Sequence, residues 1–394
     1  MITQSDSIVG ANAGRSRGHN RQVVLGRIQN AVKIGRAEIA RASGLSTQAV
    51  SNIIADLLAD GLIVEKGYRA ASRGLPVAQY ALNPDGGFAV GIEIRPDAIS
   101  AALLNLCGEP VALKRKKMAI RNRADVARAV GDMKTAVVES AGVSESALLG
   151  VGVVMPGPFG KTGLRGGATE LAIWDDTSPQ SWLSDVLELP VVVENDANAA
   201  AISEKVSGVA QGLESYAYIY FGAGLGLGVV HKGRLMAGAF GNAGEIGHLR
   251  VPSDNGLVAL QDAVSRLSLT RALRADGFEA TSVEDLSQLF RRENPSLVSW
   301  LERAVEPLSA AVSTVECLFD PQTIILGGAM PDNILDHLVC TTPLLDSSVS
   351  NRPDRSFPRL SRGTSGRMTA TLGAAALVVN QAFTPKIVQQ PQEV

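Results

Sequence analysis

A glutamate and a histidine lie three residues apart in the stretch GNAGEIGHLR, residues 241–250, among small residues. Glu245 and His248 have side chains suited to three kinds of chemistry: a catalytic acid–base pair, half of a metal site, or hydrogen bonding to a small polar ligand. A structural role is the fourth possibility, in which the pair starts a helix and only caps its backbone groups. These alternatives have to be decided from the sequence around the pair.

Two other polar groups and a glycine-rich turn follow predicted strands. Asn195 and Asp196 lie in VVVENDANAAA, where an apolar β-branched run gives way to small residues. Ligands of α/β folds bind beyond the carboxyl ends of strands, so this position favours a binding site. The stretch FGAGLGLG, residues 221–228, has backbone N–H groups that could hold an anion, but a tight hairpin explains it equally well.

From residue 83 onward, the pattern alternates between strands and helices. Short apolar runs end at Gly, Asn or Pro, and five of them are FAVGIEI, LLGVGVVMP, LPVVVEN, YAYIYFG and QTIILGG. Between the first two, a helical stretch carries Val126, Val130, Met133 and Val137 on one face. This alternation predicts an α/β body with buried sheets.

The length of this body predicts two lobes, because roughly 300 residues exceed one comfortable core. We expect the first lobe to span residues 83–195 and to be completed by a C-terminal helix at about 372–385. We expect the second lobe to span residues 196–371 and to hold the ligand cleft and the dimerisation surface.

Residues 21–82 have the pattern of a winged helix-turn-helix, which follows a polar arm, residues 1–20, that we expect to be flexible. A short helix precedes the turn SGLS, and Ser46 stands at the N-cap of the next helix. One apolar stripe on that helix consists of Val50, Ile53, Ile54, Leu57 and Leu58, and an earlier helix carries Leu25, Ile28 and Val32 on one face. The runs LIVEKG and LPVAQYAL predict a β-hairpin wing.

The polar residues of the third helix, which follows the turn SGLS, favour DNA reading over an ordinary solvated face, because its first two turns carry no Glu or Lys. Residues 1–82 contain ten Arg or Lys and five acidic residues, which gives them a charge of +5, whereas the whole chain has a net charge of −2. A basic segment of this kind is suited to binding a polyanion. We therefore expect double-stranded operator DNA to be contacted by Arg36, Ser46, Thr47, Gln48, Ser51, Asn52, Arg69 and Arg73.

Composition excludes several other classes. Three widely spaced cysteines, Cys107, Cys317 and Cys340, argue against a disulfide framework. The sequence has no apolar run long enough for a membrane span and no secretory signal at its N-terminus. We therefore expect a cytoplasmic protein without a membrane partner.

The motifs taken together resemble the ROK family, which comprises repressors, open reading frames and sugar kinases. The resemblance covers nearly the whole chain after the arm and includes the helix-turn-helix, MPGP at 155–158, ENDANAAA, GAGLGLG, AGEIGH, IILGG at 324–328 and LGAAAL at 372–377. It implies a two-lobed, actin-like (ribonuclease-H-like) ATPase fold with a sugar bound in the cleft.

The sequence departs from the family's kinases at the phosphate-binding turn. Those kinases carry an Asp-x-Gly-x-Thr-like turn after their first strand, whereas this chain has Glu93 at the aspartate position, followed by Arg95, Pro96 and Asp97. A bulky Arg, a Pro without an N–H and an acid do not form a phosphate cradle. We expect a body that is not an enzyme, in which Asp196, the base of kinase relatives, only binds a sugar hydroxyl.

A second departure removes the metal alternative for the histidine. Many family members place a cysteine cluster after GEIGH that holds zinc together with the histidine, but this chain has no cysteine between 108 and 316. The resemblance therefore implies no metal and no cofactor, and gives His248 the role of a sugar ligand. The effector-binding residues that we expect are Asn195, Asp196, Glu245, His248 and Gln261.

These observations predict a sugar-responsive transcriptional repressor of carbohydrate metabolism that binds a palindromic operator as a homodimer, possibly as a tetramer. The alternatives are an active sugar kinase with a fused DNA-binding domain, a DNA-binding protein whose body has lost its ligand, and an activator in place of a repressor.

Overall fold

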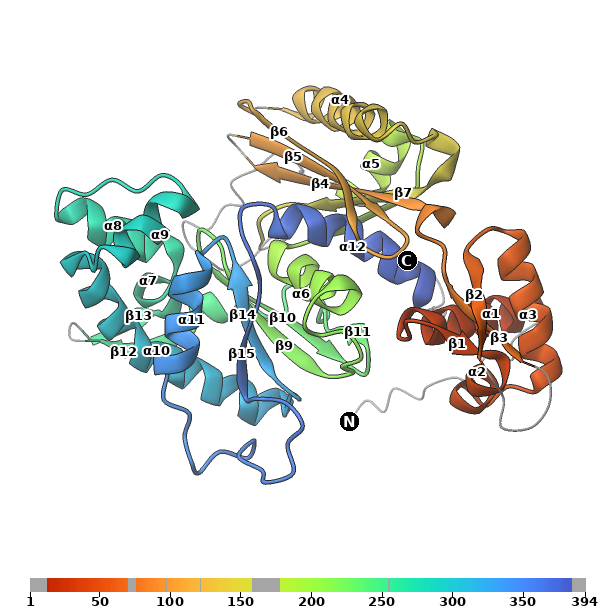
Figure 1. Cartoon of the computed structure of the whole chain (residues 1–394). Helices are drawn as coiled ribbons and strands as arrows, with labels where there is room; N and C mark the ends of the chain where they lie inside the picture. Colours follow the sequence, from red (N-terminus) through yellow and green to blue (C-terminus); the bar gives the residue numbers. More distant parts are fainter. Residues whose placement is uncertain are drawn as a thin grey trace, which may run out of the picture. The chain divides into compact units, whose positions relative to one another are not determined.

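The computed structural model describes residues 13–69, 76–95, 98–120, 122–157, 178–253 and 256–384. Their contacts divide the chain into two units. The first consists of Met1–Gly86 together with Asn380–Val394, and the second of Gly87–Val379. Figure 1 labels the helices and strands of both.

The first unit is a winged helix-turn-helix, as the sequence predicts. Its elements are α1 (Ala13–Gln29), β1 (Ile34–Gly35), α2 (Arg36–Ser43), α3 (Thr47–Ala59), β2 (Ile63–Arg69) and β3 (Val77–Leu82). The strands form an antiparallel sheet in the order β1-β3-β2, of which β2 and β3 are the wing hairpin. Gly44 ends α2 in the left-handed conformation, at φ 71°, and so permits the tight turn into α3. Ile28, Ile54 and Leu57 are fully buried in its core.

Two expectations about the first helix are wrong. The helix α1 begins at Ala13, so residues 13–20 are helical and not part of a flexible arm. Arg17 and Arg21 help to hold this early turn, because they pair with Asp56 and Asp60 at the α3 side of the unit. Val32 lies beyond the end of α1 and is 95% exposed, so it is not part of the buried face.

The second unit contains two five-stranded sheets. The first sheet has the order β6-β5-β4-β7-β8, from β4 (Phe88–Arg95), β5 (Ala98–Asn105), β6 (Pro110–Lys117), β7 (Leu148–Val154) and β8 (Val191–Glu194). The second has the order β11-β10-β9-β14-β15, from β9 (Tyr216–Phe221), β10 (Leu225–His231), β11 (Arg234–Leu235), β14 (Ile324–Gly328) and β15 (Leu360–Ser365). A separate hairpin pairs β12 (Arg250–Ser253) with β13 (Gly256–Ala259).

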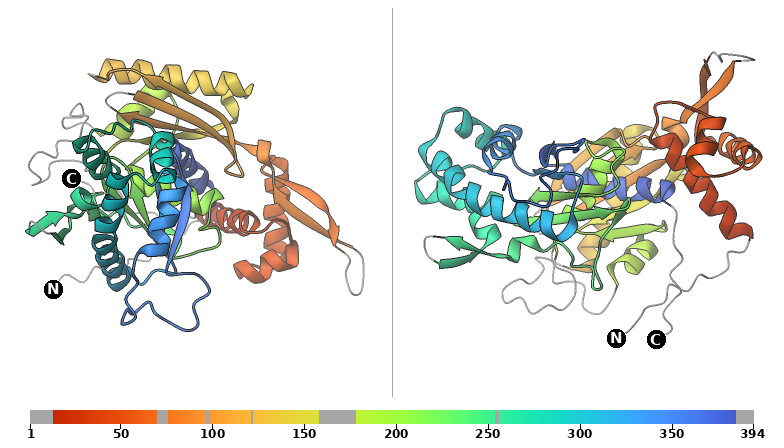
Figure 2. Two further views of the ribbon diagram at one scale, coloured as in Figure 1. Left: turned by 60° about the vertical axis from the view of Figure 1, so that its left-hand side comes forward. Right: turned by 90° about the horizontal axis from the view of Figure 1, so that it is seen from below.

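Helices cover both faces of these sheets. They are α4 (Arg123–Ala141), α5 (Pro179–Leu187), α6 (Asp196–Ser207), α7 (Leu260–Ala263), α8 (Arg266–Ala275), α9 (Val283–Arg291), α10 (Pro295–Phe319), α11 (Asp332–Thr341) and α12 (Thr369–Phe383). Short 3-10 turns are η1 (Pro84–Gly86), η2 (Glu145–Ala147) and η3 (Ile246–His248). In Figures 1 and 2, α6 and α12 lie between the two sheets.

Small residues allow this central helix layer to approach the sheets closely. A Cβ atom on Gly91 of β4 would lie 2.3 Å from backbone atoms of α12, and one on Gly152 of β7 would lie 1.7 Å from the carbonyl of Ala374. A Cβ on Gly228 of β10 would likewise meet Ala197 of α6. Only glycine therefore permits these contacts. The helix α12 packs on the first sheet, whereas residues from Asn380 onward group with the first unit.

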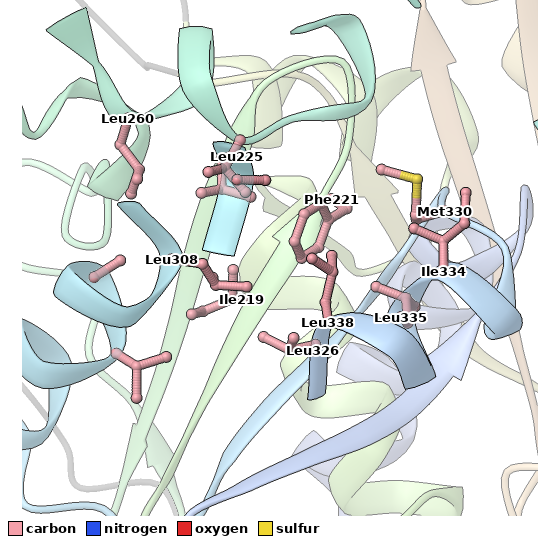
Figure 3. Close-up of a cluster of buried hydrophobic side chains, with 14 of the residues drawn as sticks. Ile219, Phe221, Leu225, Leu260, Leu308, Leu326, Met330, Ile334, Leu335 and Leu338 are labelled. Atoms are coloured by element: carbon pink, nitrogen blue, oxygen red, sulfur yellow. The ribbon is translucent and has the colours of Figure 1, made fainter. Parts of the chain in front are cut away.

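The outer face of the second sheet packs against α10 and α11. Phe221, Ile219 and Leu326 of the sheet join Leu308 of α10 and Leu335 of α11 in one buried cluster (Figure 3). Such a rigid core holds the loops beyond the carboxyl ends of the strands in fixed positions.

The parallel pairing of strands brings the candidate groups to shared edges. Strand β7 is parallel to β4 and to β8, so the carboxyl ends at Arg95, Val154 and Glu194 lie at the same edge of the first sheet. In the second sheet β9 is parallel to β14, so the carboxyl ends of these strands, at Phe221 and Gly328, lie at the same edge of that sheet.

Candidate functional site

The predicted reading helix α3 presents a polar surface at its N-terminus. Thr47, Gln48 and Asn52 are exposed and Ser51 is half-buried. Ser46 caps the helix, since its Oγ accepts a hydrogen bond of 3.2 Å from the N–H of Ala49. Nε2 of Gln48 donates to Oδ1 of Asn52 at 3.1 Å. This bond joins side chains one turn apart and arranges them as a pair on the exposed face.

The two described arginines predicted to contact DNA already have partners within the first unit. Nε of Arg36 donates to the Tyr80 hydroxyl at 2.9 Å, and its guanidinium lies 5.5 Å from the centre of that ring. Arg69 pairs with Glu38 at 2.8 Å. The third predicted arginine, Arg73, lies outside the described residues. Their contact with DNA remains a prediction.

Asn195 and Asp196 stand at the start of α6, as expected. Asn195 is buried and caps the helix, because its Oδ1 accepts a 2.8 Å bond from the N–H of Asn198. Asp196 is half-buried, and its Oδ1 accepts a 3.0 Å bond from the N–H of Ala197. A Cβ on Gly222 would lie 3.4 Å from Oδ2 of Asp196, which places this carboxylate beside the glycine-rich turn.

Glu245 and His248 flank the turn η3. Glu245 occupies the N-cap position, but its side chain makes no capping hydrogen bond. Its Oε2 lies 3.9 Å from Nε2 of His248, which is too long for a hydrogen bond. Its Oε1 would lie 3.0 Å from a Cβ on Gly157, in the MPGP turn that follows β7. The carboxylate therefore reaches across to the first sheet and does not cap its own helix.

Gln261 lies beside both the glycine-rich turn and η3. Its Oε1 would be 2.6 Å from a Cβ on Gly224 and 2.9 Å from one on Gly247. The contacts through Gly222, Gly157 and Gly247 thus bring the five predicted effector residues into one region of the second unit.

Burial changes the acidity of the carboxyl groups in this region. It raises the pKa of Asp196 to about 6; Arg95 opposes the rise, and the charges of Glu93 and Glu245 add to it. Burial also raises the pKa of Glu245, against the effect of His248. Partly dehydrated carboxylates make strong, directional hydrogen bonds to hydroxyl groups, and the region has the chemistry to hold a polyol.

The end of β4 carries an ion pair at the position where the sequence departs from the phosphate-binding turn of kinase relatives. Glu93 is buried and accepts two bonds, one of 2.5 Å from Nε of Arg95 and one of 2.7 Å from the hydroxyl of Thr371 on α12. Side chains alternate along β4, so Ile92 and Ile94 join the apolar cluster under α4 whereas Glu93 faces α12. Pro96 and Asp97 lie outside the described residues.

The sequence did not single out Arg266 as part of this region. It is the first residue of α8, and the N–H of the following Leu267 donates to the carbonyl of Ala223 at 3.3 Å. That contact sets Arg266 beside the glycine-rich turn. The sequence pattern does not predict this position of Arg266, because it depends on how α8 packs against the rest of the body.

The described residues include no group of three or more His, Cys, Asp or Glu side chains placed to hold a metal ion. After His248 the chain continues into the β12–β13 hairpin. Within the same part of the chain, no helix has both the length and the apolar character needed to cross a membrane.

Comparison with known proteins gives four similarities. The sequence model of the ROK family matches residues 89–381. The xylose repressor of Bacillus spizizenii is 25% identical over 373 residues, which cover 91% of this chain and 94% of that protein. A solved ROK family transcriptional regulator, described as a homologue of the E. coli MLC protein, aligns over 93% of this chain and 97% of its own, with a TM-score of 0.69 and 23% identity.

The fourth similarity is to a kinase. A ROK hexokinase from Thermus thermophilus aligns over 74% of this chain and 97% of its own, with a TM-score of 0.56 and 26% identity. These similarities confirm the α/β fold predicted from the sequence, in which a winged helix-turn-helix precedes a two-lobed, kinase-like body.

Proposed function

Because the chain belongs to the ROK family, we propose that it is a cytoplasmic transcription regulator that binds operator DNA through α3 and releases it when a sugar binds in the body. We infer repression by analogy with the similar xylose repressor, and we infer a homodimer because two-fold symmetry matches a palindromic operator. Carbohydrate metabolism is the process that such a regulator would control.

The observation that carries this proposal is the exposed polar face of α3. Gln and Asn are the residue types that read adenine in the major groove, and both Gln48 and Asn52 are exposed. Their mutual hydrogen bond uses only Nε2 of Gln48 and Oδ1 of Asn52. A helix that needed only to be soluble would not require this pair on the reading surface of a helix-turn-helix.

The proposed effector site explains the carboxylates of the body. Asp196 and Glu245 each lie in a partly dry environment, and neither has a cation within hydrogen-bonding distance among the described residues. Sugar hydroxyls would donate to them, while Asn195, His248 and Gln261 would complete the set. A sugar can release DNA only if it binds more tightly to the conformation with low operator affinity.

The proposal is tested by selecting an operator from a random DNA pool and measuring affinity by fluorescence anisotropy. Wild-type protein should prefer the selected site over random DNA by at least about 10³-fold. Gln48→Ala should reduce that preference by about 1–3 kcal/mol. Gln288→Ala, on the exposed surface of α9, is the matched control and should change nothing. Equal affinity of wild type for selected and random DNA would refute the proposal.

An active sugar kinase is the second candidate, favoured by the similarity to the hexokinase. Against it stands the Glu93–Arg95 pair at the end of β4, where kinases of the family hold phosphates. We expect no transfer of labelled phosphate from ATP to any sugar that the protein binds. Transfer that is lost in Asp196→Asn would establish the kinase in its place.

A further inference from the structure

Two arginines from other elements of the body lie within electrostatic reach of Arg266, and we call the three residues the arginine cluster. Arg95 ends β4, Arg266 begins α8, and Arg367 lies in the turn before α12. Burial lowers the pKa of Arg266, and the charges of Arg95 and Arg367 lower it further. Arg266 is therefore repelled by the positive charges of the other two arginines.

Arg266 lacks a partner that its position demands. Its Nε atom is buried and has no hydrogen-bond acceptor among the described residues. A buried donor without an acceptor is costly, and a charged donor more so. Arg95 is only partly engaged, because the single bond recorded for it in the described chain joins its Nε to Glu93. Both guanidinium groups thus retain donors for a ligand.

The cluster adjoins the proposed sugar site. Leu267, next to Arg266, bonds to Ala223 of the glycine-rich turn, and Asp196 approaches Gly222 of the same turn. Arg95 lies close enough to Asp196 to oppose the rise in the pKa of that carboxyl. A ligand whose hydroxyls reach Asp196 would therefore have its neighbouring substituent beside the arginines.

We propose that the arginine cluster binds an oxyanion carried by the sugar, so that the effector is a sugar phosphate or a sugar acid and not a neutral sugar. This inference rests on the proposed function. Guanidinium groups bind both phosphate and carboxylate oxygens with paired N–H donors. The arginine cluster therefore indicates an oxyanion, which either a sugar phosphate or a sugar acid would supply. The oxyanion would satisfy Nε of Arg266 and relieve the repulsion within the cluster.

The test compares the melting temperatures of full-length protein with matched ligands: glucose, glucose 6-phosphate and glucuronate, and xylose, xylose 5-phosphate and xylonate, with inorganic phosphate as an additional probe. We expect an anionic member of a set to raise the melting temperature more than its neutral parent. Preferred binding of a phosphate ester would identify the effector as a sugar phosphate, and preferred binding of an acid would identify it as a sugar acid. Titration should then give Arg266→Gln an affinity for that anion about 10- to 150-fold weaker.

Arg271→Gln is the matched control, because Arg271 lies on the same helix and pairs with Asp262 at the surface. It should retain the anion preference. Arg367→Gln, at an exposed position, provides a second reading if Arg266→Gln does not fold, and should weaken anion binding in the same direction.

Three results would overturn the inference. If a neutral sugar binds as tightly as its anionic derivatives, or if the anion preference survives both Arg266→Gln and Arg367→Gln, the cluster is not the anion site while the proposed function stands. If no sugar of either kind and no phosphate binds, sugar control itself fails, and the inference fails with it.

Discussion

Asp196 carries a cost in stability that its proposed role in sugar binding would explain. Its pKa rises from 3.8 to about 6 in the folded chain, chiefly through burial. An acid with a raised pKa binds more protons when folded than when unfolded, so the stability of the folded state falls as pH rises from about 4 to about 6. Above about pH 6, the folded state carries the full free-energy cost of holding the Asp196 carboxylate in its ionised form.

Asp196→Asn should therefore stabilise the protein without ligand. At pH 8 we expect a gain of up to about 3 kcal/mol, the value of a shift of about two pKa units, and a smaller gain at pH 5. Thermal unfolding at the two pH values measures it. Asp132→Asn, at an exposed position of α4, is the control and should have little effect. A loss of stability at pH 8 would show that the carboxylate has a structural role.

The residues of the candidate site differ in how readily they can be identified from the sequence alone. Asn195, Asp196, Glu245 and His248 could be found because each follows a strand or lies in a compact motif. Arg266 could not, since its place beside the glycine-rich turn depends on the contact of α8 with Ala223. Long-range packing of this kind leaves no local pattern in the sequence.

At the scale of elements, helix and strand signals were sufficient where local chemistry decides the structure. Ser46 caps α3 and Gly44 closes α2, as their residue types predict. The start of α1 was missed, because its polar first turns are supported by Asp56 and Asp60, which lie 39 residues further along the chain. Gly91 and Gly152 likewise weaken their strands locally and are explained only by the approach of α12.

The cap of α3 can be tested by itself. Ser46→Ala removes the acceptor for the N–H of Ala49 and should destabilise α3 by about 1 kcal/mol. Hydrogen exchange read by mass spectrometry should then be about five-fold faster in peptides covering α3, because exchange follows local opening. Ser46→Asp, which retains an acceptor, should restore slow exchange, and peptides from β9 serve as the internal control. Unchanged exchange in Ser46→Ala would mean that packing alone holds the helix.

The β12–β13 hairpin follows His248, at the place where relatives with a cysteine cluster hold zinc. We predict that its cross-strand bonds hold this segment without metal. Elemental analysis should find no stoichiometric zinc, and treatment with EDTA should leave both the melting temperature and operator binding unchanged. One zinc per chain, with a melting temperature that drops on chelation, would reveal ligands beyond those described.

At the scale of the whole molecule, one chain carries a DNA-binding fold and a kinase-like body. In the proposed function these parts are linked: the body would bind a sugar, and the sugar would change the affinity of the first unit for DNA. Linkage requires the converse as well, so operator DNA should weaken sugar binding by the same factor. A body that served only to hold two copies together would show no such coupling.

The most direct test titrates a preformed protein–operator complex with the sugar or sugar derivative that raises the melting temperature most. Wild-type protein should release the operator. Glu245→Gln should bind the operator equally well without effector but need about 5- to 150-fold more effector for release, because an amide in place of the half-buried carboxylate loses about 1–3 kcal/mol of hydrogen bonding. Release of Glu245→Gln at the wild-type concentration, or no release of wild type by a ligand that demonstrably binds, would contradict the account.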